Sequence, residues 1–305
     1  MITGACGHIG SYIVENIYKI KKIKKVTLID NLSSKRYSSL FDIATSKKKI
    51  EFFNIDLSQK KSLRHFKRHD VVIHCASFTN AEDSFYIKKE MYRNNLNCMK
   101  NIVNFCKKNN SKLIHLSSTS VYGKKAKLVK EKDKHLLKPQ SPYAEIKLKE
   151  ERLLNKNKKK LKYISFRLGT ITGVSKGIRF HTAVNKFCLN AATNDYINIY
   201  KTALNQYRPY LSLRDAFKIF QFCIEKNIFK NDIFNALSGN FTVKGILSKI
   251  KKNRKNIKIK FIDSPIMNKL SYHVDGSKIK NLGLNLNANI EYDIKQTLNL
   301  FNGVK

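Results

Sequence analysis

The chain has 305 residues, of which 42% are hydrophobic, so it is long enough to bury one substantial core, or a core and a smaller lobe. No run of about 18 apolar residues could span a bilayer, and the six cysteines show neither a CxxC pair nor a zinc-like spacing, so we expect a cytoplasmic protein without a membrane partner, a disulfide framework or a bound metal. The formal charge of +38 comes from lysines that are scattered without interleaved aromatic residues, which favours a compositional bias over a nucleic-acid-binding surface.

The first half of the chain alternates short apolar runs with segments of helical periodicity. Runs typical of buried strands occur at residues 26–30, 50–54, 71–74, 112–117 and 163–167. Helical periodicity occurs at residues 9–20, 84–107 and 143–154. The fold class we predict is therefore α/β, with a doubly wound parallel sheet of the Rossmann type and helices on both faces.

Beyond about residue 174 this alternation loosens into mixed helices and short strands. We expect residues 1–173 to form the dinucleotide-binding sheet domain and residues 208–237 to return to it. Residues 174–207 and 238–305 are expected to form a smaller α/β lobe that binds the substrate.

The first strand of the predicted sheet is short of residues. A strand typically has about five residues, but only Met1, Ile2 and Thr3 precede the first glycine. Either this strand is unusually short or the start site lies a few residues earlier, and we favour the second explanation. The central strand is therefore the weakest element of the predicted sheet.

Three glycines with a spacing of three follow this strand. Gly4 can turn the chain sharply, Gly7 can let the backbone approach a pyrophosphate, and Gly10 can let the next helix pack closely on the strand. The free N–H groups at the helix start, at His8, Ile9 and Gly10, would then face the phosphates. The turn predicts a dinucleotide site.

An acidic residue ends the second predicted strand, 20 residues beyond the last glycine. The Asp30 carboxylate can accept hydrogen bonds from both ribose hydroxyls of the adenosine and would repel a 2′-phosphate, which favours NAD over NADP. Asn31 follows it, whereas Lys35 and Arg36 leave an opening for NADP. Asp56 and Leu57, after the third strand, are placed to meet the adenine.

A serine cluster, a tyrosine and a lysine provide the candidate chemistry. The strand at 112–117 runs into Ser117–Gly123, and Tyr143 and Lys147 follow at a spacing of four, so they share one helix face. A lysine ammonium stabilises a phenolate and lowers the pKa of a tyrosine from about 10. Such a tyrosine can take a proton from an alcohol while hydride leaves the same carbon.

Together these motifs resemble the extended short-chain dehydrogenase/reductase family, in its NAD-dependent epimerase/dehydratase branch. The stretches that carry the resemblance are TGACGHIGS from Thr3, DNLSS from Asp30, PQSPYAEIK from Pro139, RPYLSLRDA from Arg208 and DGSKIKNLG from Asp275. They are similar to the nucleotide turn, active-site helix, diphosphate-binding segment and C-terminal signature of UDP-glucose 4-epimerase-like enzymes. The resemblance runs over nearly the whole chain.

The resemblance implies a role for each matching residue. Ser118 would bond the reacting sugar oxygen, Tyr143 would be the acid/base, and Lys147 would bind the nicotinamide ribose and tune Tyr143. Ala76 and Asn95 would line the path of the cofactor. The residues that would bind the substrate are Thr119, Thr170 and Arg208. The family also implies a homodimer through the helices at 84–107 and 143–154.

The residues after Ser118 bear on the reaction. Dehydratases of this branch carry an Asp-Glu pair there, whereas this chain has Thr119 and Ser120. We therefore expect a nucleotide-sugar epimerase that works through transient hydride transfer and a keto-sugar intermediate. A keto-sugar reductase or dehydrogenase using NAD(P) remains an alternative, and a non-catalytic NAD-sensing or nucleic-acid-binding protein a further one. Thr170 stands where epimerases have an asparagine, so the sugar and the inverted carbon stay open.

Overall fold

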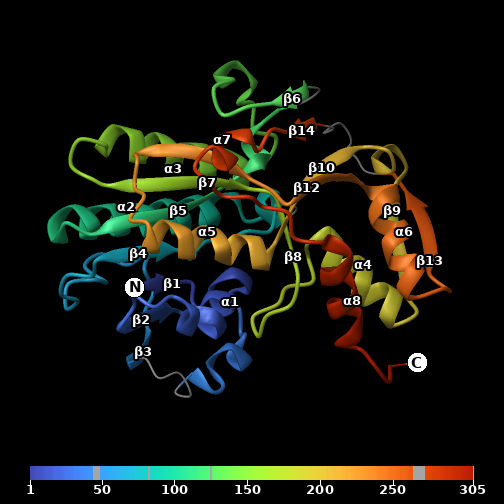
Figure 1. Cartoon of the computed structure of the whole chain (residues 1–305), viewed down its shortest axis with the longest axis horizontal. Coiled ribbons are helices and arrows are strands. Elements are labelled where there is room, and N and C mark those ends of the chain that lie inside the picture. Colours follow the sequence, from blue (N-terminus) through green and yellow to red (C-terminus); the bar gives the residue numbers. More distant parts are fainter. Residues whose placement is uncertain (44–48, 82, 124–125, 264–271, 305) are drawn as a thin grey trace.

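The computed structural model describes residues 1–305 except 44–48, 82, 124–125, 264–271 and 305 (Figure 1). Its largest element is a seven-stranded sheet in the order β11-β7-β5-β4-β1-β2-β3, and every neighbouring pair of strands is parallel. The predicted Rossmann-type fold is confirmed. The strands are β1 (Ile2–Thr3), β2 (Lys25–Asp30), β3 (Lys49–Asn54), β4 (Val71–His74), β5 (Lys112–Ser118), β7 (Tyr163–Leu168) and β11 (Asp232–Ala236).

The five predicted strands are confirmed to within one residue at either end, because each is a mainly apolar run, although β3 at the sheet edge has no buried residue. Residues 113–117 of β5 are all buried, as is the whole of β7. Between β4 and β2 lies β1, which has two residues and pairs with both neighbours. The glycine turn therefore leaves the centre of the sheet.

Two of the predicted helices need correction. The segment at 9–20 divides into α1 (His8–Asn16) and a 3-10 turn at Ile17–Lys19, while Asp83–Phe85 is a second 3-10 turn and α2 begins only at Lys88, to end at Asn109. The apolar spacing continues through these turns, so periodicity alone did not reveal the breaks. The third helix, α3 (Pro142–Asn157), is confirmed, and it begins where the Ser141 hydroxyl accepts a hydrogen bond from the Ala144 N–H at 3.2 Å.

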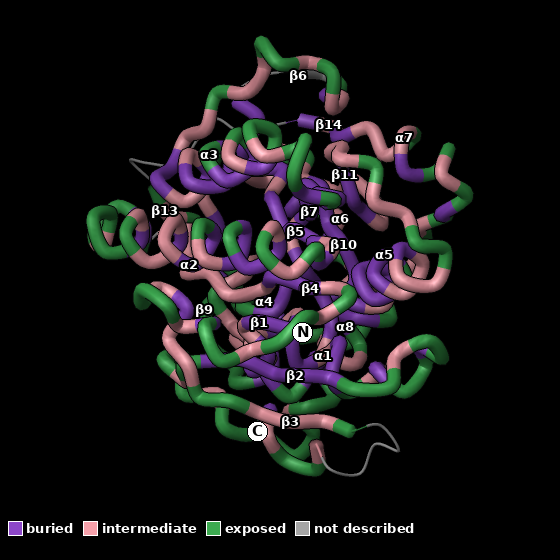
Figure 2. Tube along the Cα trace, turned by 90° about the vertical axis from the view of Figure 1, so that its left-hand side faces the viewer, coloured by how far each residue is buried: buried purple, intermediate pink, exposed green. Residues whose placement is uncertain are grey.

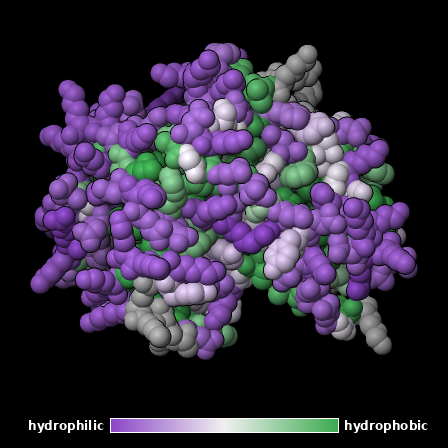
Figure 3. Space-filling model, in the orientation of Figure 1, coloured by the Kyte–Doolittle hydropathy of each residue, from purple (hydrophilic) through white to green (hydrophobic). Residues whose placement is uncertain are grey.

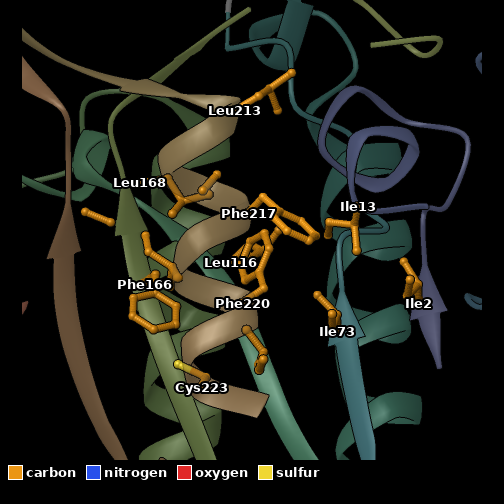
Figure 4. Packing of buried hydrophobic residues seen from close by; sticks show 14 of the residues in the cluster. Ile2, Ile13, Ile73, Leu116, Phe166, Leu168, Leu213, Phe217, Phe220 and Cys223 are labelled. Atoms are coloured by element: carbon orange, nitrogen blue, oxygen red, sulfur yellow. The ribbon is translucent and has the colours of Figure 1, made fainter. Parts of the chain in front are cut away.

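The helices cover the sheet on both sides. One face packs against α1 and α5 (Leu213–Glu225), whose Phe217 and Phe220 meet Ile13, Leu116 and Phe166 in one cluster (Figure 4). The other face packs against α2 and α3 in a second cluster, which includes Met99 and Ile102 of α2 and Leu154 of α3. Figure 2 shows the buried stretches gathered in the strands between these helix layers.

A smaller lobe lies beside the carboxyl ends of the strands (Figure 1). Its elements are β8 (Thr170–Thr172), β10 (Tyr207–Ser212) and β12 (Gly239–Thr242) in one sheet, β9 (Tyr196–Tyr200) and β13 (Lys258–Ile262) in a second, and the helices α4 (Ala183–Ala192), α6 (Val243–Asn253) and α8 (Ile290–Asn299). A further pair joins β6 (Ala126–Val129) to β14 (Tyr272–Val274), and α7 (Ser277–Lys280) packs against β11. After β10 the chain re-enters the larger part of the molecule as α5 and β11.

Side chains fasten the lobe to the sheet part. Asp293 of α8 accepts a hydrogen bond from Arg214 of α5 at 3.1 Å and, within the lobe, one from Thr172 of β8 at 2.7 Å. All six cysteines are free thiols. Among the described residues, no helix combines the length and the apolar character that crossing a bilayer requires. Figure 3 shows hydrophilic residues spread widely over the face that it displays.

Candidate active site

The glycine turn is a close-packed junction between β1, α1 and β4. Gly4 has φ +64°, and a Cβ there would lie 2.6 Å from the Ala76 nitrogen. A Cβ on Gly10 would lie 2.1 Å from the Gly4 carbonyl oxygen, so α1 can approach the turn only with glycine at this position. Gly7 precedes α1, whose first turn has no side-chain cap. Its leading N–H groups are therefore available to an anion.

The Asp30 carboxylate is fixed at the end of β2. One of its oxygens accepts the Cys6 N–H at 3.0 Å, and the other accepts the Leu32 N–H at 2.8 Å. The residue is 8% exposed, so it is held rigidly at the rim of the turn. Each oxygen retains a free lone pair, which is the acceptor pattern that a ribose diol requires.

A crevice at this edge of the sheet brings most of the predicted cofactor residues together. Those lining it are Gly4, Gly7, Asp30, Asn31, Asp56, Leu57 and Ala76. His8, Ile9, Gly10 and Asn95 are not among its described lining residues. Asn95 is fully buried in α2 and bonds the backbone N–H and carbonyl of Phe78, which does line the crevice.

These residues fit a dinucleotide. The glycines leave no side chain over the start of α1, Asp30 presents an ordered carboxylate, and the loops after β3 and β4 form the opposite walls. Arg36, which the sequence identified as an opening for NADP, also lines the crevice, and burial lowers its pKa although Asp30 opposes the shift.

The candidate catalytic side chains come from β5 and α3, which pack against each other. Ser118 ends β5, and its hydroxyl oxygen accepts hydrogen bonds from the Ser120 N–H at 3.1 Å and the Ser120 hydroxyl at 2.9 Å. The Ser118 proton is therefore free to be donated. On α3 the Lys147 ammonium lies 5.8 Å from the centre of the Tyr143 ring. The structure thus places these two side chains on one helix face, as their spacing predicts.

Lys147 also has a partner that sequence reasoning missed. Its ammonium lies 2.9 Å from Oε2 of Glu150, and the same oxygen lies 3.0 Å from Nε2 of His115. Burial lowers the pKa of Lys147, but Glu150 and Tyr143 more than offset this, so the pKa is raised. Burial raises the pKa of Glu150, yet Lys147 and His115 outweigh it and bring the value to about 2.

The predicted substrate residues lie on the lobe side of Ser118. Thr119 is buried and donates from its hydroxyl to the Leu168 carbonyl at 3.2 Å, while its own carbonyl accepts from the Tyr272 hydroxyl at 3.2 Å. The guanidinium of Arg208 lies 5.9 Å from the centre of that Tyr272 ring, and burial lowers the pKa of Arg208. Thr170 is half-buried in β8, which pairs with β10, the strand that carries Arg208. Tyr272 thus connects Arg208 to the serine cluster, which no local pattern revealed.

Several buried polar atoms without a hydrogen-bond partner among the described residues belong to His8 and to residues 179–185. In the described part of the chain, six buried side-chain nitrogen or oxygen atoms have no hydrogen-bond partner, and four belong to His8, Arg179, Thr182 and Asn185. Arg179 bonds Thr79 through Nη1, its Nε is unpartnered, and burial lowers its pKa while Tyr143 opposes the shift. No ion pair of Arg179 with a carboxylate is present among the described residues. No motif in the sequence identified this cation.

Comparisons with known proteins agree with this geometry. The model of the NAD dependent epimerase/dehydratase family matches residues 1–236. The bifunctional protein GAL10 of Candida maltosa is 35% identical over 129 residues, which are 40% of this chain and 83% of that protein. A trifunctional UDP-glucose 4,6-dehydratase/UDP-4-keto-6-deoxy-D-glucose 3,5-epimerase/UDP-4-keto-L-rhamnose-reductase of Arabidopsis thaliana is 24% identical over 99% of this chain. The chain spans 46% of that protein, which is about half of its length.

Solved structures share the whole fold. The UDP-glucuronic acid 4-epimerase of Bacillus cereus superposes with a TM-score of 0.89 at 21% identity, covering 100% of this chain and 99% of that one. The dTDP-glucose 4,6-dehydratase DesIV of Streptomyces venezuelae gives 0.88 at 17% identity, covering 99% and 96%. Identities this low show the fold alone, whereas the family model covers more than two thirds of the sequence. The chain therefore belongs to the NAD dependent epimerase/dehydratase family.

Proposed function

We propose that the chain is an NAD-dependent nucleotide-sugar epimerase, with Tyr143 as its acid/base. The observation that carries the proposal is the composition of the catalytic edge. Tyr143 and Lys147 share one face of α3, which packs against β5, and β5 ends at Ser118, with Thr119 and Ser120 at the next positions. The part of the chain around the seven-stranded sheet would hold the cofactor, and the lobe, which includes β8 and β10, would hold the sugar nucleotide.

The chain's own groups would act on a sugar hydroxyl. Ser118 would donate a hydrogen bond to the sugar oxygen, while the phenolate of Tyr143 would take the proton of that hydroxyl and later return it. Lys147 keeps a positive charge beside Tyr143 and stabilises the phenolate that takes up this proton. When bound, NAD supplies the acceptor for the hydride that leaves the sugar carbon and returns to its other face.

The neighbours of Ser118 argue against elimination of water. Thr119 is 4% exposed, and its hydroxyl donates a hydrogen bond to the Leu168 carbonyl, while the Ser120 hydroxyl donates one to Ser118. Neither side chain ionises near neutral pH. No carboxylate is therefore supplied by the two positions that follow Ser118, and a dehydration step would lack an acid/base there.

Two half-buried arginines indicate an anionic substrate. Arg208 lies near the Thr119–Tyr272 contact and suits a diphosphate as a bidentate donor. Arg179 is close enough to Tyr143 for their charges to interact, and its Nε has no hydrogen-bond partner among the described residues. A further anionic group of the substrate could accept a hydrogen bond from this Nε. Acidic nucleotide sugars such as UDP-glucuronic acid therefore belong beside UDP-glucose among the candidates.

Turnover of candidate sugars tests the proposal. The purified protein is first analysed by mass spectrometry for ligands that co-purify, and nucleotide sugars are then followed by NMR without added cofactor. An epimerase interconverts two stereoisomers with no net change in absorbance at 340 nm. Stoichiometric consumption of reduced nicotinamide would instead identify a reductase, and formation of a 4-keto-6-deoxy sugar would identify a dehydratase. Either result would overturn the proposal.

A further inference from the structure

A row of polar side chains crosses the interior of the sheet beneath α2 and α3. Thr3, His74, His115 and Ser165 stand opposite one another on the neighbouring strands β1, β4, β5 and β7. Thr3 Oγ1 lies 2.8 Å from His74 Nδ1, and His115 Nδ1 lies 2.8 Å from Ser165 Oγ. Residues two positions earlier on β4, β5 and β7 are the apolar Val72, Leu113 and Tyr163. The side chains on this face of the sheet therefore change from apolar to polar at this row.

The Lys147–Glu150 pair of α3 packs onto this row. The side chains of Lys147, Glu150 and His115 are 5%, 1% and 0% exposed, so bulk water does not solvate their charges. One Glu150 oxygen meets both Lys147 and His115, and Ser165 holds the far nitrogen of His115. The carboxylate is thus fixed from the sheet side while it faces the ammonium.

Other titratable groups near Lys147 do not provide this negative charge. Burial raises the pKa values of the Cys75 and Cys98 thiols to about 12, so both are neutral near pH 7. Burial lowers the pKa of His74 to about 3, so it too is neutral. Tyr143 is the proposed acid/base, whose phenolate the Lys147 ammonium would stabilise. Glu150 is the carboxylate paired with Lys147 among the described residues.

We propose that Glu150, held in place by His115 and Ser165, is the counter-ion that keeps the buried Lys147 protonated and positions its ammonium beside Tyr143. It is a positioning residue, and it acts on the reaction only through Lys147. The inference rests on the proposed function for its catalytic consequence, but its first step concerns only the charge of Lys147. A fully buried lysine without a counter-ion loses its proton several pH units below its ordinary value of about 10.4.

The next residue of α3 offers a matched control. Glu151 is 4% exposed and accepts two hydrogen bonds from Arg167, at 2.9 and 2.7 Å, and one from Ser117 at 2.5 Å. It is as buried and as well paired as Glu150, but it belongs to a separate network. Glu151→Gln should therefore lower stability without changing the charge of Lys147.

The test follows the titration of Lys147 directly. Protein with [13Cε]-labelled lysine is titrated from pH 6 to 10 by NMR, and the signal missing from Lys147→Met is that of Lys147. We expect no titration of Lys147 below pH 9 in the wild type or in Glu151→Gln. In Glu150→Gln its midpoint should fall by about 2 pH units or more. Glu150→Asp, which keeps the charge on a shorter side chain, should give an intermediate midpoint and serves if Glu150→Gln does not fold.

Activity profiles test the catalytic step separately. If turnover is found, its alkaline limb should move to lower pH in Glu150→Gln by the same amount as the Lys147 midpoint, and stay in place in Glu151→Gln. An ammonium that survives to pH 9 in Glu150→Gln and Glu150→Asp would overturn the counter-ion role. A shifted Lys147 midpoint with an unmoved activity profile would overturn its link to catalysis. Because the NMR titration needs neither cofactor nor substrate, an inactive protein would count against the proposed function and not against the counter-ion.

Discussion

Gly177 lies in the segment between β8 and α4, and it offers a quantitative test of how this segment supports the glycine turn after β1. A Cβ at this position would lie 2.3 Å from the Cys6 carbonyl oxygen and 2.7 Å from that of Gly7. Ordinary contacts of carbon with such atoms begin at about 3.4 Å, so Gly177→Ala must push the two segments apart by about 1 Å. At Gly177, the segment after β8 therefore lies directly against the backbone of the turn after β1.

The cost has two parts. Overpacking of this kind costs about 1–3 kcal/mol. Separation also weakens the hydrogen bond from the Gly177 N–H to the Ser11 hydroxyl, 2.9 Å in the native structure, which contributes about 1 kcal/mol. The total of about 2–4 kcal/mol corresponds to a fall in Tm of about 4–8 °C for a chain of this size. Because the displaced residues form the proposed pyrophosphate site, NAD affinity should fall about tenfold or more.

Thermal unfolding and calorimetric titration with NAD measure the two effects. Gly245→Ala is the control, since its Cβ would meet only the Thr242 hydroxyl at 3.3 Å in the lobe helix α6. We expect it to change Tm by about 2 °C at most and to leave NAD affinity unchanged. If Gly177→Ala keeps both its Tm and its NAD affinity within the range of Gly245→Ala, the close contact does not support the turn and the reasoning is refuted.

Four further outcomes are expected. Asp30→Ala should weaken NAD binding about 10- to 100-fold, because hydrogen bonds to a charged group are lost, and should admit NADP; calorimetry that finds the same preference for NAD contradicts this. Tyr143→Phe should lower turnover at least about 100-fold while calorimetry shows NAD still bound, and lost binding would count against its role as acid/base. Arg179→Met should raise the KM of an anionic substrate about 10-fold or more without changing NAD affinity, whereas a weaker NAD complex would assign this cation to the cofactor. Burial lowers the pKa of His74 from 6.5 to about 3, so unfolding takes up a proton between these values and stability decreases as the pH falls; His74→Gln should reduce that slope near pH 5 by up to about 1.4 kcal/mol per pH unit in urea denaturation, and an unchanged slope would show that His74 is not neutral in the fold.

The sheet and the cofactor edge could be predicted because their signals are local. The five predicted strands are mainly apolar runs, and the glycine spacing followed by Asp30 places a turn, a helix and an acid on consecutive elements. The spacing of Tyr143 and Lys147 identified their shared face in the same way. Such patterns can be recognised in the sequence without knowing which strands are neighbours in the sheet.

The counter-ion network could not be predicted because its members meet only through strand register. His115 is one polar residue within a buried strand, and Glu150 is one of several charged residues on a lysine-rich helix. They come together because β5 lies between β4 and β7 under α3. Arg179 was missed for a related reason: it lies in a segment of little periodicity, and its importance follows from the absence of a partner for its Nε among the residues that the structure describes.

The position of β11 has a consequence for how the protein folds during synthesis. β11 is the edge strand beside β7, yet β8, α4, β9 and β10 lie between them in the sequence. The ribosome must therefore release most of the lobe's first half before the sheet can acquire its last strand at Ala236. α7, which covers β11, emerges later still. The two parts cannot mature one after the other from the N-terminus, as separate domains do, but must consolidate together late in translation.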